Sequence, residues 1–189
     1  MFNTAYMIAV VSRIGEEVIV SGGIRRALIK VRCYDSKGDI TEGTIMLSEL
    51  GELRKSTGLS VGDVIFFAAS LSEGVKDSLV FRPHDIYILR KGFIPAEELS
   101  DRLIDAKLLP YKEDHNIVVL DGRVSVIEKE NICLIVENQE TLRGDSSSEF
   151  HIWVVSTDKK ILKSVKVGQK ATFIGELSKG KLKGKVFAQ

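Results

Sequence analysis

The sequence contains little cysteine, proline or tryptophan and no long apolar run. Its 189 residues include two cysteines, three prolines and one tryptophan. Cys33 and Cys133 lie inside apolar runs and not at the C-x-x-C spacing of metal or redox sites, so we expect two buried thiols. The longest apolar run near the amino terminus, residues 7–11, has the length of a strand, which argues against a membrane-spanning helix. A soluble, cytoplasmic protein is therefore expected.

An excess of charge of one sign is also missing. The 27 basic and 26 acidic residues give a net charge of +1, so the chain as a whole has no strong electrostatic field. The charges are nevertheless uneven, because residues 159–189 contain nine lysines and a single acidic residue, Glu176. Hydrophobic residues make up 44% of the chain and charged residues 28%, which is typical of a globular protein with a buried core.

Strand patterns dominate the first half of the chain. Short runs rich in valine, isoleucine and aromatic residues are separated by glycines. They predict strands at residues 6–14, 27–34, 44–47, 64–71 and 79–89. Between the third and fourth strands, Leu50 and Leu53 have helical spacing and Ser48 is a suitable N-cap, which predicts a helix over residues 48–57.

The second half repeats this plan. It predicts strands at residues 117–127, 132–136, 150–156, 171–177 and 182–187, with a short helix over residues 158–165. Residues 59–71 align without a gap on residues 165–177, and Cys33 and Cys133 both fall in the second strand of their half. Self-similarity of this kind indicates a duplicated unit.

Residues 93–115 break the pattern and divide the chain into three parts. Pro95 and the acidic pair Glu97 and Glu98 suit the start of a helix, and Pro110 suits its end. We expect a first domain over residues 1–92, a helical linker over 93–115 and a second domain over 116–189. The linker helix is expected to pack between the domains; the alternative is that it binds a partner through Leu99, Leu103 and Ile104.

Three motifs in the second half occur in the order found in one known family. The alternating pattern Asn116-x-Val118-x-Leu120-x-Gly122-x-Val124 comes first. Glu149-Phe150-His151 follows, and Gly168, Gly175 and Leu177 then occupy a Gly-x6-Gly-x-Leu pattern. This order resembles the bacterial single-stranded-DNA-binding protein family, whose OB fold is a five-stranded barrel. The first half matches only through the internal repeat.

The resemblance implies an all-β protein with short helices, in which two five-stranded OB-fold barrels are joined by the helical linker. It implies non-catalytic binding of single-stranded DNA, in replication, recombination or transfer of a mobile element. Family members assemble four such barrels, so two per chain suggest a homodimer. The family usually ends in an acidic tip that recruits replication and recombination proteins; the likeness here is to a form without it, so recruitment by that route is not expected.

Binding of an unpaired strand needs cations for the phosphates and aromatic faces for the bases. In the predicted strand 27–34, alternation places Ile29, Val31 and Cys33 in one row and Lys30, Arg32 and Tyr34 in the other. OB folds bind along strands two and three, so this second row is a candidate binding row. Arg25 and Arg26, in the expected loop before it, and Arg123 after Gly122 extend the candidate set. The competing interpretation is a solvated strand edge.

In the predicted strand 150–156, alternation separates two rows but does not say which faces outward. The family resemblance assigns Phe150 to base stacking, because Phe150 takes the position of the family's tryptophan. His151 would then point into the core, and so would Trp153. A bulge would reverse this arrangement, so Trp153 stays in the candidate set.

Lysines recur with a period of two near the carboxyl terminus. Lys179, Lys181, Lys183 and Lys185 lie in and after the turn between the last two strands, where they can reach phosphates. Phe187 shares their row if residues 182–187 form a strand. The alternative is an edge strand that lysines protect from aggregation.

Motifs of catalysis and metal binding are incomplete. His84, His115 and His151 are far apart and lack the spacing of metal ligands. Residues 175–182 nearly form a phosphate-binding P-loop, but Leu182 replaces the required serine or threonine. We therefore expect no enzymatic activity, no cofactor and no metal. The alternatives to DNA binding are an OB-fold subunit that binds another protein, and an RNA-binding protein.

Overall fold

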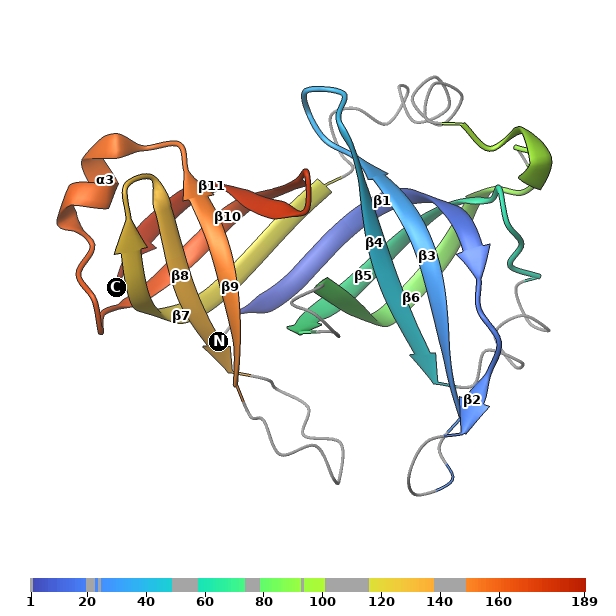
Figure 1. Ribbon diagram of the computed structural model, residues 1–189, viewed down its shortest axis with the longest axis horizontal. Coiled ribbons are helices and arrows are strands. Elements are labelled where there is room, and N and C mark those ends of the chain that lie inside the picture. The colour runs from blue at the N-terminus through green and yellow to red at the C-terminus, as the bar shows by residue number, and fades with distance from the viewer. Residues whose placement is uncertain are drawn as a thin grey trace.

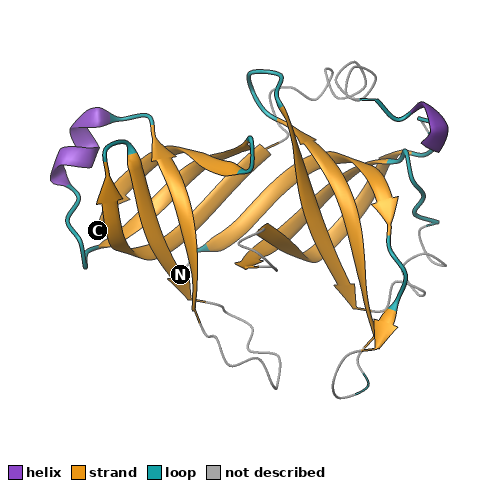
Figure 2. Ribbon diagram, viewed as in Figure 1, coloured by secondary structure: helices purple, strands orange, loops and turns teal. Residues whose placement is uncertain are grey.

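The computed structural model describes residues 2–19, 23, 25–48, 58–73, 79–92, 94–100, 116–137 and 149–189. Two strand-rich halves lie side by side (Figures 1 and 2). The first half contains β1 (Asn3–Ile14), β2 (Val18–Ile19), β3 (Arg25–Tyr34), β4 (Ile40–Ser48), β5 (Val64–Glu73) and β6 (Leu79–Arg90). The second contains β7 (Asn116–Glu128), β8 (Asn131–Glu137), β9 (Glu149–Ser156), α3 (Lys159–Ser164), β10 (Lys170–Ser178) and β11 (Lys181–Ala188).

The strand pairings of each half form a closed circuit. In the first half β1 pairs with β3, β3 with β4, β4 with β6, β6 with β5, and β5 again with β1. In the second half the same circuit runs through β7, β8, β9, β11, β10 and back to β7. The predicted strands of both halves are thus confirmed, as is the all-β fold class.

Local differences from the predictions have simple causes. Arg25 and Arg26 lie in β3 and not in a loop, because the short strand β2, which was not predicted, pairs with both. Ser48 is the last residue of β4, and residues 49–57 of the predicted helix lie outside the described residues. The second predicted helix is confirmed as α3, whose N-cap Asp158 accepts hydrogen bonds from the main-chain nitrogens of Lys160 and Ile161.

The two copies of the repeat share an identical turn. Gly62 N donates to Val11 O at 2.8 Å, and Gly168 N donates to Val124 O at 2.8 Å. Both glycines have positive φ angles, 90° and 86°, which residues other than glycine rarely adopt. A Cβ atom on Gly62 would lie 1.8 Å from Ile94 O. The gapless alignment of residues 59–71 with 165–177 therefore marks equivalent structure.

The halves join through an antiparallel pairing of β1 with β7. The pairing is centred on Ala5 opposite Val118, and both side chains are fully buried. It makes a continuous antiparallel sheet in the order β6-β5-β1-β7-β10-β11. The inward rows of both halves, including Phe67, Phe81 and Phe173, form one apolar core that spans the junction.

The start of the predicted linker packs onto the first half. Ile94 is buried and Leu99 partly buried against Ile8, Val10 and Tyr34 on the outside of the strand circuit. Residues Ala96–Glu98 form a single 3-10 turn, and the remainder of the predicted helix, from 101 to 115, lies outside the described residues. Among the described residues, no helix is long and apolar enough to cross a membrane.

Candidate nucleic-acid interface

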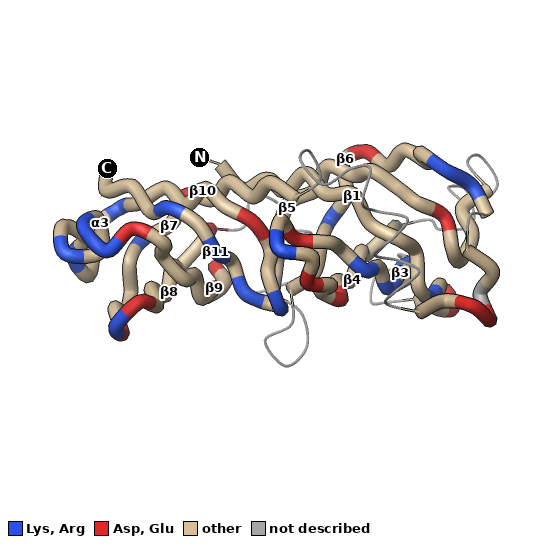
Figure 3. Tube along the Cα trace, turned by 90° about the horizontal axis from the view of Figure 1, so that it is seen from above, with Lys and Arg blue, Asp and Glu red and all other residues tan. Residues whose placement is uncertain are grey.

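The β3–β4 hairpin of the first half and the β8–β9 hairpin of the second half correspond to strands two and three of an OB fold, and both lie on one side of the molecule (Figure 1). Figure 1 shows the β3–β4 and β8–β9 hairpins in front of the long sheet, and Figure 3 shows the same separation from above. The outer faces of these hairpins are the positions at which OB folds bind oligonucleotides. Residues that bind an oligonucleotide are therefore expected on these two outer faces.

The outer row of β3 carries the expected cations. Arg26, Lys30 and Arg32 alternate with fully buried Ala27, Ile29 and Val31. Lys30 Nζ donates to Thr44 Oγ1 at 2.7 Å and lies 3.7 Å from Glu42 Oε1. Arg13 of β1 is exposed and pairs with Lys30; sequence reasoning missed Arg13, because only the strand pairing brings it beside the row. Arg25 is exposed at the start of β3.

Tyr34 does not belong to the accessible row, contrary to the prediction. Its side chain is 5% exposed and packs with Ile8, Val10, Val64 and Ile94. The alternation of β3 was predicted correctly, but the segment that follows β6 covers the outer face at this end of the strand. The Tyr34 ring is therefore not available for base stacking.

The rows of β9 are the reverse of the prediction. Phe150 is 1% exposed and points into the core, whereas His151 is exposed and Trp153 is 42% exposed. Ile152 and Val154 continue the buried row without a bulge. The choice made from the family motif was wrong because the Phe150 ring fills the interior of the second half. Trp153 takes its place as the accessible aromatic residue.

Trp153 lies in a pocket that both halves help to form. The pocket has a volume of about 480 Å³. Its lining comprises Leu79 from the first half and Glu128, Asn131, His151, Ile152, Trp153, Gly180 and Lys181 from the second. Cys133 pairs with Trp153 under this surface, and its Sγ lies 3.8 Å from His151 Nδ1. An exposed indole beside an exposed ammonium is the combination that single-strand binding requires.

The four lysines of the β10–β11 hairpin have different surroundings. Lys181 lines the Trp153 pocket, and Lys185 is exposed further along β11. Lys179 Nζ forms an ion pair with Asp39 Oδ2 at 3.0 Å. Lys183 lies beside Lys37, whose hydrogen bond and positive charge lower the pKa of Lys183. The predicted alternation of β11 is present, because Leu182 and Val186 are buried between the lysines.

The other end of β11 belongs to a different surface. Phe187 is 42% exposed and pairs with Thr172 on the outer face of the long sheet. The structure therefore places Phe187 away from Trp153, although both were in the predicted set.

The β10–β11 hairpin is attached to the β3–β4 turn of the first half. Ser178 Oγ donates to Asp35 Oδ2 at 2.6 Å, and Ser36 N and Oγ donate to the two oxygens of Glu176 at 3.0 and 2.7 Å. Burial alone would raise the pKa of Asp35. The hydrogen bonds from Ser178 and from the main-chain nitrogens of Asp39 and Lys37, with the charge of Lys179, outweigh burial and leave this pKa below its ordinary value.

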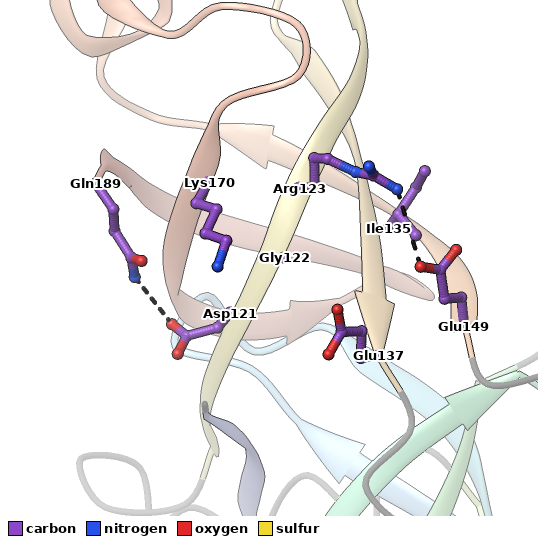
Figure 4. Close-up of a pocket in the computed structure, with 8 residues that line it drawn as sticks. All are labelled: Asp121, Gly122, Arg123, Ile135, Glu137, Glu149, Lys170 and Gln189. Atoms are coloured by element: carbon purple, nitrogen blue, oxygen red, sulfur yellow. Dashed lines mark hydrogen bonds and ion pairs between the residues drawn. The ribbon is translucent and has the colours of Figure 1, made fainter.

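Arg123 lies on the outer face of the second half. It pairs with Ile135, which in turn pairs with His151. Figure 4 shows Arg123 reaching toward Glu149, and its Nη2 lies 3.8 Å from Glu149 Oε1. The neighbouring pocket, of about 350 Å³, also contains Asp121, Glu137 and Lys170. Arg123 is thus a partly neutralised cation at the margin of the Trp153 surface.

Both cysteines are buried free thiols, as predicted, and burial raises the pKa of Cys33 to about 12. The described part of the chain contains no group of three or more His, Cys, Asp or Glu side chains that could hold a metal ion.

Comparison with known proteins identifies the fold. No protein-family model and no curated protein matches the sequence. The wild-type single-stranded DNA binding protein of Thermus aquaticus superposes with a TM-score of 0.67 at 14% identity, covering 100% of this chain and 93% of that one. A deletion mutant of the same protein gives 0.62 at 13% identity, covering 100% and 94%. The chain therefore has the two-OB fold of the Thermus aquaticus single-stranded DNA binding protein.

Proposed function

We propose that this protein binds single-stranded DNA without catalysing a reaction. The observation that carries the proposal is the exposed Trp153 beside Lys181 on the β8–β9 face of an OB fold. The likeness to the Thermus aquaticus protein supports it, since that protein binds single-stranded DNA. The proposal includes two OB domains, at residues 1–92 and 116–189, and a cytoplasmic location.

The chemistry of binding follows from the two faces. Lysine and arginine neutralise phosphates and release counterions, so affinity falls as salt rises. The Trp153 ring stacks on an unpaired base, an interaction worth roughly 1–3 kcal/mol per base. Neither contact distinguishes one base sequence from another, which suits coating and protection of DNA in replication or recombination.

Oligo-dT titration tests the proposal directly. Trp153 is the only tryptophan in the chain, so its fluorescence reports contact with a base at this one position. We expect quenching that saturates, and a linear fall of log K with log salt whose slope is about −0.7 per phosphate contact. A wild-type protein that binds no oligo-dT at low salt would refute the function.

Competition between oligonucleotides distinguishes DNA binding from the two alternatives, RNA binding and protein interaction. If oligo-U displaces labelled oligo-dT at a lower concentration than unlabelled oligo-dT does, the protein prefers RNA, whose 2′-hydroxyl lets a protein distinguish it from DNA. If neither binds and a protein copurifies, the protein-interaction alternative holds.

The proposal includes a homodimer formed through the long sheet. On its outer face Tyr6 (41% exposed) pairs with Ile117 (45% exposed) at the junction of the halves. Tyr87, Ile174 and Phe187 extend this apolar face, with exposures of 55%, 44% and 42%. Exposed apolar side chains on one face of a sheet favour an interface with another protein chain. Because the face is opposite the β3–β4 and β8–β9 hairpins, dimerisation leaves both DNA-binding faces open.

A further inference from the structure

We infer that the two halves have different tasks: the second half stacks bases at Trp153, and the first half holds the phosphate backbone by charge alone. This division rests on the proposed binding of single-stranded DNA and specifies which chemistry each half contributes to it. The sequence repeat alone would suggest two equal sites.

Equivalent positions follow from the strand pairings. Val11 and Val124 are equivalent, because each accepts the hydrogen bond of the repeated glycine turn. Val11 pairs with Val31, and Val124 pairs with Leu134. A bulge follows in β1 and in β7, between Val11 and Arg13 and between Val124 and Val126. The two second strands can therefore be matched residue by residue.

This matching exposes a difference in chemistry at each outward position. Lys30 of β3 corresponds to Cys133 of β8, and Arg32 corresponds to Ile135. In the next strand, Thr44 of β4 pairs with Lys30, and Trp153 of β9 pairs with Cys133. Thr44 therefore corresponds to Trp153. Glu42 corresponds to His151 in the same way.

The outer face of the first half is therefore cationic and contains no ring at the positions matched here. Arg13, Arg26, Lys30 and Arg32 lie on it, with the exposed Leu28 between Arg26 and Lys30 and with Glu42 as the acidic member of the same rows. The aromatic residue predicted for this face, Tyr34, is buried. Such a surface attracts phosphates and offers bases no flat partner.

The outer face of the second half has the complementary chemistry. Trp153 and His151 are exposed over the apolar residues Cys133 and Ile135, and Lys181 is next to the indole. The pocket of about 480 Å³ has room for a base, and Leu79 of the first half supplies part of its wall. When an unpaired base stacks on Trp153, the DNA backbone attached to it therefore lies at the border of the cationic first half.

Two probes of equal length separate the two tasks: oligo-dT, and the same sugar-phosphate backbone without bases. Trp153→Ala is expected to weaken oligo-dT binding about 5- to 150-fold, as for the loss of one stacked base. It is expected to leave the abasic probe and the salt slope unchanged. Trp153→Phe should restore part of the oligo-dT affinity, because it keeps an aromatic face.

The double variant Arg13→Gln/Arg26→Gln is expected to weaken both probes equally. It should also make the salt slope shallower by about 0.7 for each phosphate that the variant no longer neutralises. Lys166→Gln, in the turn before β10, is the matched control for the removal of a positive charge. Anisotropy of labelled probes gives affinity, and thermal melting shows that each variant is folded.

The inference is overturned if Trp153→Ala weakens the abasic probe as much as oligo-dT, or if the arginine variant keeps the wild-type slope. Either result is compatible with DNA binding by the wild type. Failure of the proposed function has a different outcome, since the wild type would then bind neither probe.

Discussion

The side-chain amide of Asn116 continues the β7–β10 ladder by hydrogen-bonding to both the main-chain carbonyl and the main-chain N–H of Leu177. Asn116 Nδ2 donates to Leu177 O at 2.7 Å, and Asn116 Oδ1 accepts from Leu177 N at 2.9 Å. Asn3 makes the same pair with Leu71, at 3.0 and 2.8 Å. At both places the main chain of the asparagine strand turns to the β1–β7 junction, and the amide replaces the missing strand partner.

Removing either amide should therefore destabilise the fold. Asn116→Ala leaves the buried main-chain groups of Leu177 without partners, which costs about 1–3 kcal/mol. Asn3→Ala should cost a similar amount. Urea unfolding measures both, with the half-buried Asn131→Ala as control. A loss no larger than that of the control would show that water replaces the amide.

Phe150 and Trp153 should respond to truncation in opposite ways. Phe150→Ala removes a ring that is 1% exposed and should lower stability by about 3–5 kcal/mol. Trp153→Ala should leave the melting temperature nearly unchanged and weaken oligo-dT binding. Thermal melting and labelled-oligonucleotide anisotropy of the two variants distinguish these effects. The reverse result would restore the arrangement that the family motif suggested.

The contact between Asp35 and Ser178 should depend on pH. In the folded protein the pKa of Asp35 lies below its ordinary value of 3.8. The Asp35 carboxylate therefore stabilises the fold at every pH above the pKa that Asp35 has in the unfolded chain. This contribution is lost as the pH falls through the lower, folded-state pKa. Ser178→Ala should raise the pKa of Asp35 and reduce stability at neutral pH by about 1–3 kcal/mol.

Carbon-detected NMR titration of the Asp35 carboxyl group measures the pKa, and urea unfolding as a function of pH measures the stability. The stabilities of wild type and Ser178→Ala should converge in acid. Ser164→Ala, which changes an exposed hydroxyl on α3, is the control. An unchanged Asp35 pKa in Ser178→Ala would mean that the other hydrogen bonds suffice.

Charge on the long sheet should separate the proposed dimer. Tyr6→Glu/Ile117→Glu places two carboxylates side by side at the centre of the apolar face. Sedimentation velocity should then give half the wild-type mass, because the like charges would have to be buried against a second copy. Val126→Glu changes a residue that is 40% exposed beyond the β1 pairing, and it should leave the mass unchanged. A wild-type monomer would refute the dimer.

The strands were predictable because their signals are local. Alternating apolar side chains, β-branched residues and glycine turns depend on a few neighbouring residues. The observed strands extend one to four residues beyond the predicted ones at most ends, as from residues 6–14 to Asn3–Ile14. The two-residue strand β2 was missed, because it exists only through its pairing with Arg25 and Arg26.

Local sequence patterns were sufficient to predict the positions of the strands along the chain, the duplication, the two buried thiols and the residues of a strand that share a row. Tertiary structure decided which row faces solvent. In β9 the core accepts Phe150 and leaves Trp153 outside, a choice between two apolar rows that alternation cannot make. In β3 the outward position of Tyr34 is covered by Ile94 and Val64, residues distant in sequence. Exposure depends on every segment that packs against a residue, and that sum exists only in the folded chain.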